Sequence, residues 1–394
     1  MLASLSLIFI VGLAMGAICQ KLKLPRIIGM LVTGIVLGPY VLDLLDPSIL
    51  SISAELRKMA LIIILLKAGL SLDLKDLKKA GRSAILLSFV PASFEIAGYV
   101  LCAPAILGIT RVEAAVMGAV LGAVSPAVVI PRMVTLMEKK YGTEKAIPQM
   151  IMAGASCDDI FVIVLFTTFL SIAQGGHANV LDFVNIPVSI VLGIILGAVT
   201  GYGLYLFFET AYARKHCVRN SMKVIIVLGF SFLLVSVEGW LEGKISVSGL
   251  LAVVAMACVI KMKSPVFVSK RLSEKFGKLW LAAEVMLFVL VGAAVDIRYT
   301  LSAGLSAVLM IFVALLFRSV GVLLCVAGSR LTWKERLFCV IAYLPKATVQ
   351  AAIGSVPLSA GLSCGKIVLS VAVLAIIITA PLGAIGMDAA YQRL

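Results

Sequence analysis

A chain of 394 residues, of which 62% are hydrophobic and only 14% charged, lies with its mean hydropathy of +1.14 far outside the range of soluble globular proteins. Its formal net charge of +14 suggests a nucleic-acid partner, but Lys and Arg stand in short clusters between apolar runs. The positive-inside rule of membrane proteins explains these clusters better. The composition therefore predicts an all-α polytopic membrane protein that binds no nucleic acid.

Thirteen apolar segments are predicted as membrane spans, since one crossing of the bilayer needs about 20 mostly apolar residues. We do not expect the first to be a cleaved signal peptide, because residues 1–4 carry no basic side chain and the next apolar run follows closely. The predicted spans cover residues 3–19, 26–41, 56–72, 83–108, 112–131, 147–172, 183–208, 222–238, 246–261, 279–295, 302–328, 336–358 and 366–388.

The basic loop residues alternate between the two sides of the membrane. Connections that lead from an odd to an even span hold most of them: Lys21, Lys23, Arg26, Lys75, Lys78, Lys79, Arg82, Arg132, Lys139, Lys140, Lys145, Arg214, Lys215, Arg219, Lys223, Lys261, Lys263, Lys270, Arg271, Lys275, Lys278, Arg330, Lys334 and Arg336. The other connections hold only Arg57, Lys58, Arg111, Lys244, Arg298 and Lys366, together with acids such as Asp43, Asp46, Glu238 and Glu242. Cytoplasmic loops collect Lys and Arg, so we expect the N-terminus outside and the C-terminus in the cytoplasm.

The thirteen spans divide into two groups of six and one linker. We predict a single membrane transporter unit over residues 1–394, with repeat one at 1–172, a linker helix at 183–208 and repeat two at 222–388. An odd offset inverts the second repeat relative to the first, as in many secondary transporters. Because the loops are short and Leu394 follows closely on the last span, we expect no soluble regulatory domain.

The cysteines and histidines give no sign of a metal centre. The eight cysteines are scattered singly, with no C-x-x-C pair, so neither a disulfide framework nor zinc is indicated. His177 and His216 fall in predicted loops. We therefore expect no cofactor and no histidine-based catalysis.

Two adjacent carboxylates, Asp158 and Asp159, stand in the middle of the apolar segment 147–172. One ionised Asp at the centre of a membrane helix costs roughly 2.5–3.5 kcal/mol on insertion scales, so a pair indicates function. Adjacent helical residues point about 100° apart, and the two side chains therefore face different surroundings.

Three further charges lie deep in predicted spans: Glu95, Arg318 and Lys346. Glu95 is in the fourth span of its half and Arg318 in the fourth of the other half, so we predict that they form an ion pair. Such a pair can be a fixed brace, or it can switch during transport or tune the carboxylates. Lys67 is read as a snorkelling residue and Glu284 as a packing or interfacial one.

The fifth span of each half carries helix breakers at membrane depth. The first half has Ser125 next to Pro126, with Pro131 beyond. The second half has Pro345, Lys346 and Thr348 at the corresponding place. Proline removes a backbone donor, and freed carbonyls in a membrane are tolerated only where protein or water satisfies them. Matched breaks in two halves predict a binding site, where Lys346 can balance one of the carboxylates.

Three motifs in this order resemble the cation/proton antiporters, and within them the NHA branch, also called sodium/hydrogen exchanger subfamily B. The motifs are Val124-Ser125-Pro126-Ala127-Val128-Val129-Ile130-Pro131, Ala153-Gly154-Ala155-Ser156-Cys157-Asp158-Asp159-Ile160, and Pro345-Lys346-Ala347-Thr348-Val349-Gln350-Ala351-Ala352-Ile353-Gly354. The resemblance covers nearly the whole chain. It implies an NhaA-like fold with two crossed discontinuous helices, in a homodimer whose protomers have a dimerisation domain and a mobile core, in the bacterial inner membrane.

The resemblance also supplies roles for residues. It implies that Asp159 carries the ion and the proton, that Asp158 pairs with Lys346, and that Glu95 and Arg318 are the core ion pair. Asp159 would then bind either H⁺ or a hard cation such as Na⁺ or Li⁺, which suffices for exchange if only the occupied site reorients. Further oxygen ligands would come from Ser125, Thr348 and freed backbone carbonyls.

Other functions remain as alternatives at this stage. An intramembrane aspartyl protease does not fit, because its two carboxylates must converge from separate helices, whereas these are adjacent on one. A passive channel differs from an exchanger by the absence of counterflow. Among transporters, K⁺/H⁺ exchange and Na⁺-coupled symport of an organic anion are the alternatives to Na⁺/H⁺ exchange.

Overall fold

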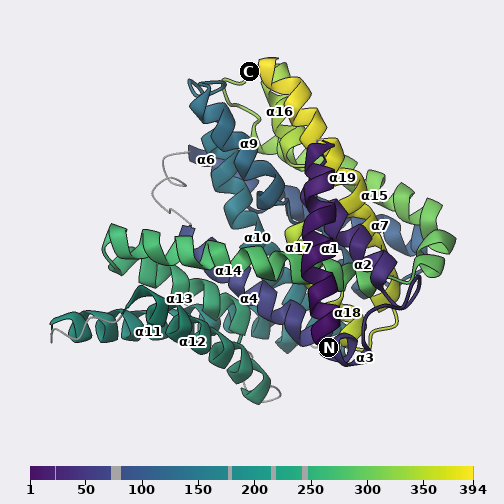
Figure 1. Cartoon of the computed structure of the whole chain (residues 1–394). Helices are drawn as coiled ribbons and strands as arrows, with labels where there is room; N and C mark the ends of the chain where they lie inside the picture. The colour runs from purple at the N-terminus through teal and green to yellow at the C-terminus, as the bar shows by residue number, and fades with distance from the viewer. Residues whose placement is uncertain (23, 72–80, 176–179, 214–218, 242–246, 394) are drawn as a thin grey trace. The chain divides into compact units, whose positions relative to one another are not determined.

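The computed structural model describes all residues except 23, 72–80, 176–179, 214–218, 242–246 and 394. In the described part nearly every residue is helical or in a short connection, and no strand occurs there (Figure 1). Some of the groups singled out from the sequence lie outside the described residues: Lys23, Lys75, Lys78, Lys79, Arg214, Lys215, Lys244, Glu242, Cys217, His177, His216 and the side chain of Arg298.

The chain divides into two compact units. Unit 1 comprises Met1–Arg57, Asp73–Gln174 and Val285–Leu394, and unit 2 comprises Lys58–Leu72 and Gly175–Glu284. Unit 1 takes segments from both predicted repeats. Its bounds therefore do not coincide with the predicted repeat boundaries.

Unit 1 contains most of the helices. They are α1 (Leu2–Lys21), α2 (Arg26–Leu37), α3 (Pro47–Ser51), α6 (Gly81–Leu87), α7 (Val90–Leu107), α8 (Arg111–Leu121), α9 (Pro126–Glu138), α10 (Ile147–Ala173), α15 (Ile297–Cys325), α16 (Trp333–Ala342), α17 (Thr348–Ile353), α18 (Val356–Ser359), α19 (Gly365–Ala390) and the 3₁₀ turn η1 (Tyr391–Arg393).

Unit 2 is built from α11 (Val180–Ala213), α12 (Asn220–Leu241) and α13 (Gly249–Lys263). Two helices pass from one unit into the other, namely α4 (Ser53–Ser71) and α14 (Val266–Ala293).

Eight helical segments of the described chain are long and apolar enough to cross a membrane. They coincide with eight of the thirteen predicted spans. The other five predicted spans also contain helices, but these helices are short, interrupted or more polar: α2, α4, α8 with α9, α13, and α16 with α17 and α18. The count of thirteen crossings therefore stays a prediction, while the all-helical membrane class is confirmed.

Helix α14 begins at Val266, thirteen residues before the predicted span at 279. The sequence predicts that residues before 279, with their Lys and Arg, belong to a connection between spans. Leu272, Phe276 and Trp280 recur every four residues and are buried, so this stretch is an amphipathic helix that carries its Lys and Arg on the other face. Loop assignment by charge missed this periodicity.

Within unit 2, α11 packs closely on α13 through glycines spaced four residues apart. A Cβ built on Gly197 would lie 2.1 Å from the carbonyl oxygen of Ala252, and one on Gly193 2.7 Å from that of Ser248. Small residues at this spacing let two membrane helices approach backbone to backbone. The close approach therefore depends on the absence of side chains at these positions.

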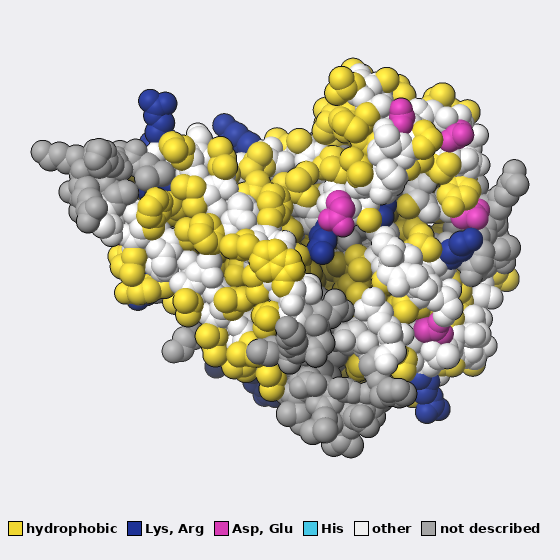
Figure 2. All heavy atoms as spheres, turned by 90° about the horizontal axis from the view of Figure 1, so that it is seen from below, with side chains coloured by type: hydrophobic (Ala, Val, Ile, Leu, Met, Phe, Trp, Pro, Cys, Tyr) yellow, Lys and Arg dark blue, Asp and Glu magenta, His cyan; other side chains and the backbone are white. Residues whose placement is uncertain are grey.

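The surface of the molecule is strongly apolar. On the face that Figure 2 shows, hydrophobic side chains are widespread and charged ones are few. Leu101, Ile225 and Leu305 are 68%, 69% and 86% exposed. Large aliphatic side chains exposed in such number match a hydrocarbon solvent rather than water.

The two chain termini lie at opposite ends of unit 1 (Figure 1). At one end the terminal amine of Met1 pairs with Asp46 at 3.0 Å. At the other end Arg132 of α9 pairs with Asp388 of α19 at 3.1 Å, and the rings of Tyr141 and Tyr391 meet edge to face. An odd number of crossings would place the termini in this way.

Candidate ion-binding site

Two interrupted helices of unit 1 meet at their breaks. The first break separates α8 from α9, where Gly122 ends one helix and Pro126 opens the next. The second separates α16 from α17, where Pro345 lies in the non-helical stretch. The backbone N–H of Ser125 donates to the carbonyl of Pro345 at 2.8 Å. The interruptions predicted from Pro and Gly are therefore present, and the two come into direct contact.

Gln350 of α17 joins the two breaks through its side-chain amide. Its Nε2 donates to the carbonyl of Ala123 at 2.8 Å and reaches that of Leu121 at 3.4 Å, at the end of α8. Its Oε1 accepts from the backbone N–H of Ala347 at 2.8 Å. Both ends of the fully buried amide are thus used to satisfy backbone groups that helical bonding leaves free.

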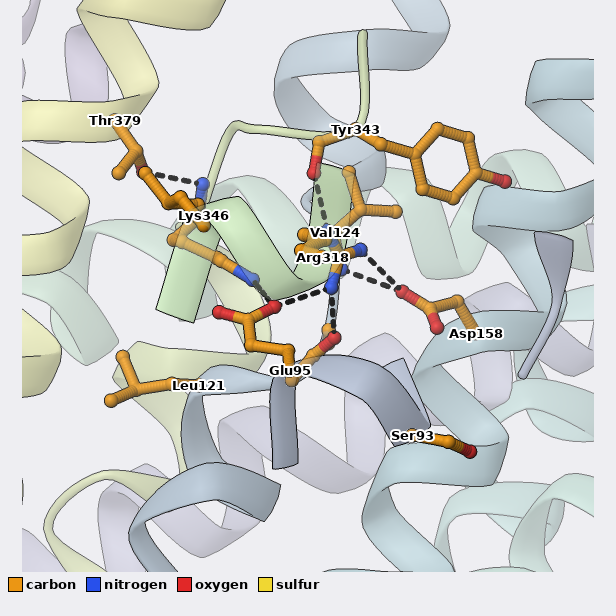
Figure 3. A network of polar contacts seen from close by, with 12 residues as sticks. Ser93, Glu95, Leu121, Val124, Asp158, Arg318, Tyr343, Lys346 and Thr379 are labelled. Carbon is orange, nitrogen blue, oxygen red and sulfur yellow. Dashed lines mark hydrogen bonds and ion pairs between the residues drawn. The ribbon is translucent and has the colours of Figure 1, made fainter. Parts of the chain in front are cut away.

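Arg318 of α15 lies at the centre of the network (Figure 3) and is fully buried. Its Nη1 donates to Glu95 Oε2 at 2.6 Å and to the carbonyl of Gly122. Its Nε donates to the carbonyl of Tyr343 at 2.5 Å, and its Nη2 to Asp158 Oδ2 at 3.2 Å. One guanidinium therefore binds two carboxylates and one freed carbonyl from each break, which its planar set of donors permits.

Lys346 lies in the second break and donates from Nζ to Glu95 Oε2 at 2.5 Å. Its backbone N–H donates to Thr379 Oγ1 at 2.9 Å. Among the described residues Lys346 forms its ion pair with Glu95 rather than with Asp158, the partner expected from the sequence. Glu95, which was predicted to pair with Arg318, accepts from both Arg318 and Lys346 through one oxygen, as Figure 3 shows.

Asp158 of α10 is fixed through one of its two oxygens. Oδ2 accepts from the backbone N–H of Val124 in the first break at 2.7 Å and from Arg318. Oδ1 is buried and has no hydrogen-bond partner. Because a buried polar atom without a partner is costly, this oxygen is a candidate for binding a transported ion.

Asp159 is 6% exposed, and within the described residues it takes part in no ion pair. Its Oδ1 is buried and without a hydrogen-bond partner, as are Ser125 Oγ and Thr348 Oγ1. These groups come from α10 and from the two breaks that meet beside it. The four residues named from the sequence as ion ligands thus each hold an unused buried oxygen.

The charges of the site do not balance. Its acidic groups are Glu95, Asp158 and Asp159, and its basic groups are Arg318 and Lys346. The two cations bond to the first two carboxylates, which leaves Asp159 without a compensating charge among the described residues. A monovalent cation or a proton on Asp159 would make the site neutral.

Some predicted residues and ligands are placed differently. Lys67 and Glu284 belong to unit 2, outside this network. Several freed carbonyls accept hydrogen bonds from protein donors: those of Leu121, Gly122, Ala123, Tyr343 and Pro345. In the part of the chain that the structure describes, no three His, Cys, Asp or Glu side chains cluster as a metal site would require.

Sequence reasoning missed two polar residues of the network as functional. Gln350 was noted only as part of a motif, although a Gln inside an apolar run is a signal of its own. Thr379 gives little signal, because a hydroxyl in a membrane helix commonly bonds to its own backbone. Its partner, the N–H of Lys346, is free only because the second helix is broken.

Comparisons with known proteins point to one family. The family described as "Sodium/hydrogen exchanger, transmembrane" matches residues 5–388. The chain belongs to the sodium/hydrogen exchanger family. Sodium/hydrogen exchanger 9B2 of Homo sapiens is 36% identical over 378 residues, which cover 92% of this chain and 68% of the relative. Sodium/hydrogen exchanger 9B1 of Homo sapiens is 33% identical over 409 residues, covering 98% and 76%.

A solved structure supports the same fold. The sodium proton antiporter MjNhaP1 from Methanocaldococcus jannaschii superposes with a TM-score of 0.82 at 21% identity, over 99% of this chain and 96% of that one. At this identity the likeness concerns the fold alone. The exchanger family consists of transporters, so the prediction of a multi-pass membrane antiporter and not an enzyme is confirmed.

Proposed function

We propose that this exchanger moves Na⁺, or Li⁺, against H⁺ by alternating access, and that cation and proton compete for Asp159. The observation that carries the proposal is the charge imbalance of the buried network, in which two cations bond to Glu95 and Asp158 and none to Asp159. An isolated carboxylate at membrane depth is costly unless something neutralises it. Either transported ion supplies that neutralisation.

The unused oxygens beside Asp159 suit a hard cation. Na⁺ and Li⁺ prefer oxygen ligands, and candidates are Asp158 Oδ1, Ser125 Oγ and Thr348 Oγ1. A proton on Asp159 removes the charge that attracts the cation, so the two ions bind in competition. Asp158 contributes one oxygen while Arg318 and Val124 hold the other in place.

The reorientation step follows from the proposed architecture of thirteen spans in two inverted repeats. Transporters of this kind bind their ions at discontinuous helices near the midplane and rock one part against another. We extend the proposal to a homodimer in the lipid of a bacterial inner membrane, with the N-terminus outside and the C-terminus in the cytoplasm. The names of the relatives favour Na⁺/H⁺ exchange over K⁺/H⁺ exchange or organic-anion symport.

The proposal is tested with Asp159→Asn in proteoliposomes that contain a pH-sensitive dye. The amide keeps the shape of the side chain but can neither take up a proton nor supply the charge for a cation, so Na⁺-driven proton movement should fall to the level of empty vesicles. Asp43→Asn is the matched control, because it makes the same change in an exposed loop and should leave transport intact.

Na⁺, Li⁺ and K⁺ are offered in turn, with and without a membrane potential. Full activity of Asp159→Asn, with both variants folded, would remove Asp159 from the exchange step. A wild-type response to K⁺ alone would replace the proposed ions by K⁺.

A further inference from the structure

The first halves of the two broken helices open with the same motif. The Thr110 hydroxyl accepts a bond from the N–H of Glu113, and the Glu113 carboxylate accepts one from the N–H of Thr110. The two bonds form a capping box at the start of α8. Thr332 and Glu335 form the same box at the start of α16. The two boxes stand at corresponding positions of the two predicted repeats, at the N-terminus of each interrupted helix.

Each capping glutamate has a second partner, and the two partners also correspond. Ser363, two residues before α19, donates its hydroxyl to Glu113 Oε1. Lys145, two residues before α10, donates to Glu335 Oε1 and Oε2 at 2.9 and 2.8 Å. Each glutamate thus connects the N-terminus of a broken helix to the start of the long helix that follows the other break. Glu113 connects α8 to α19, and Glu335 connects α16 to α10. The first connection is a neutral hydrogen bond and the second is an ion pair.

The ion pair of Lys145 and Glu335 is one of several contacts that connect α10 to α16 beside the ion site. At their N-terminal ends, α10 and α16 are joined by the ion pair of Lys145 and Glu335. Arg318 joins them a second time, because it bonds to Asp158 in the middle of α10 and to the carbonyl of Tyr343 at the C-terminal end of α16. Because no helical hydrogen bond crosses the break, tertiary contacts such as these must set the position of α16.

The two helices also touch between these two connections. A Cβ built on Gly154 of α10 would lie 2.2 Å from the hydroxyl of Tyr343. With three contacts along the two helices, we expect the position of α10 along α16 to depend on the pair of Lys145 and Glu335.

The connection that carries Lys145 has a strained backbone. Lys140 and Ala146 have φ values of 61° and 53°, in the left-handed region that side chains disfavour. Such a backbone persists only when its surroundings hold it. Lys145, with its bidentate contact to Glu335, directly precedes Ala146 and the first turn of α10.

The surroundings of Glu335 favour its charged form. Burial alone would raise the pKa of Glu335, but the Lys145 ammonium and the N–H and hydroxyl of Thr332 outweigh it and hold that pKa below its ordinary value. The carboxylate therefore stays charged beside Lys145.

We propose that Lys145 and Glu335 are positioning residues for the ion site, which set where α10 presents Asp158 and Asp159 to the two breaks. This inference rests on the proposed exchange at Asp159. The pair touches neither ion, so its loss should change the concentration of Na⁺ that gives half-maximal exchange rather than abolish exchange.

The test compares Lys145→Met with Lys140→Met, which removes the same charge from an exposed position of the same connection. In proteoliposomes Lys145→Met should raise the KM for Na⁺ about threefold or more, as loss of a partly buried ion pair allows, with kcat changed less. Lys145→Arg keeps the pair and should restore the wild-type KM. Lys140→Met should leave it unchanged.

Two further measurements separate the possible results. Added choline chloride screens exposed charges, so it should raise the wild-type KM more than that of Lys145→Met. Amide hydrogen exchange of the first turns of α10 and α16 should speed up in Lys145→Met, and this readout does not depend on transport.

Faster amide exchange with an unchanged KM would overturn the positioning role, and so would an equal KM shift in Lys140→Met. If the wild type moves no protons in response to Na⁺ or Li⁺, the proposed function itself fails, and the amide exchange then reports on the contact alone.

Discussion

Arg318 restores, with a single side chain, hydrogen bonds that two interrupted helices lose. It donates to the carbonyls of Gly122 and Tyr343, one from each break, while its charge is shared by Glu95 and Asp158. Removing one partner from a buried ionic network commonly costs about 3–5 kcal/mol. The guanidinium therefore holds the two breaks together and also neutralises the carboxylates.

Gln350 is the neutral counterpart of Arg318, and its replacement gives a prediction at the residue scale. Gln350→Leu removes the donor to Ala123 and leaves that buried carbonyl unbonded, which should cost about 1–3 kcal/mol. The melting temperature in detergent should fall by several degrees. Gln20→Leu makes the same change on an exposed position and should not lower it. Equal melting temperatures for both variants would mean that water replaces the lost donor.

The partners of the buried charges were only partly predictable from sequence. The positions of Glu95 and Arg318 in corresponding spans indicated that they meet, and they lie in contact. The partner of Lys346 was assigned by analogy to Asp158, but its ammonium reaches Glu95. With three acids and two bases at similar depth, the choice depends on side-chain paths of a few ångströms, which a linear pattern does not contain.

At the scale of elements, the breaks were predictable and the ends of helices were not. Gly122, Pro126 and Pro345 remove helical bonding locally, so the interruptions follow from residue type. The early start of α14 is marked instead by the burial of Leu272 and Phe276 in the folded chain. This burial depends on tertiary packing, and the many charges of the segment made a loop the simpler prediction.

The packing of α11 on α13 gives a prediction for an element. Gly197→Ala places a methyl group 2.1 Å from the carbonyl oxygen of Ala252, so the helices must separate and the melting temperature should fall. Gly203 lies on the same helix with open space around its Cβ position. Gly203→Ala should leave the melting temperature unchanged or raise it, because Ala favours the helix. A fall of the same size in both variants would show that α11 itself, rather than its contact, is sensitive.

At the scale of the whole molecule, the alternation of loop charges predicts which side each loop faces. A single cysteine is placed at Asp43 or at Lys140 in a chain freed of its eight native cysteines. In right-side-out vesicles, a membrane-impermeant maleimide should label Asp43→Cys directly and Lys140→Cys only after the membrane is opened. The reverse pattern would invert the proposed orientation.

The network around Arg318 can form only late in synthesis of the chain. Arg318 follows Asp158 by 160 residues and Glu95 by 223, and Lys346 comes later still. At about 5–20 residues per second, ribosomes need roughly 8–32 s to go from Asp158 to Arg318. During that interval the emerging first half has carboxylates in the membrane without their cations. A chain halted before Arg318 is therefore an incomplete ionic structure, and the second half of synthesis completes the first.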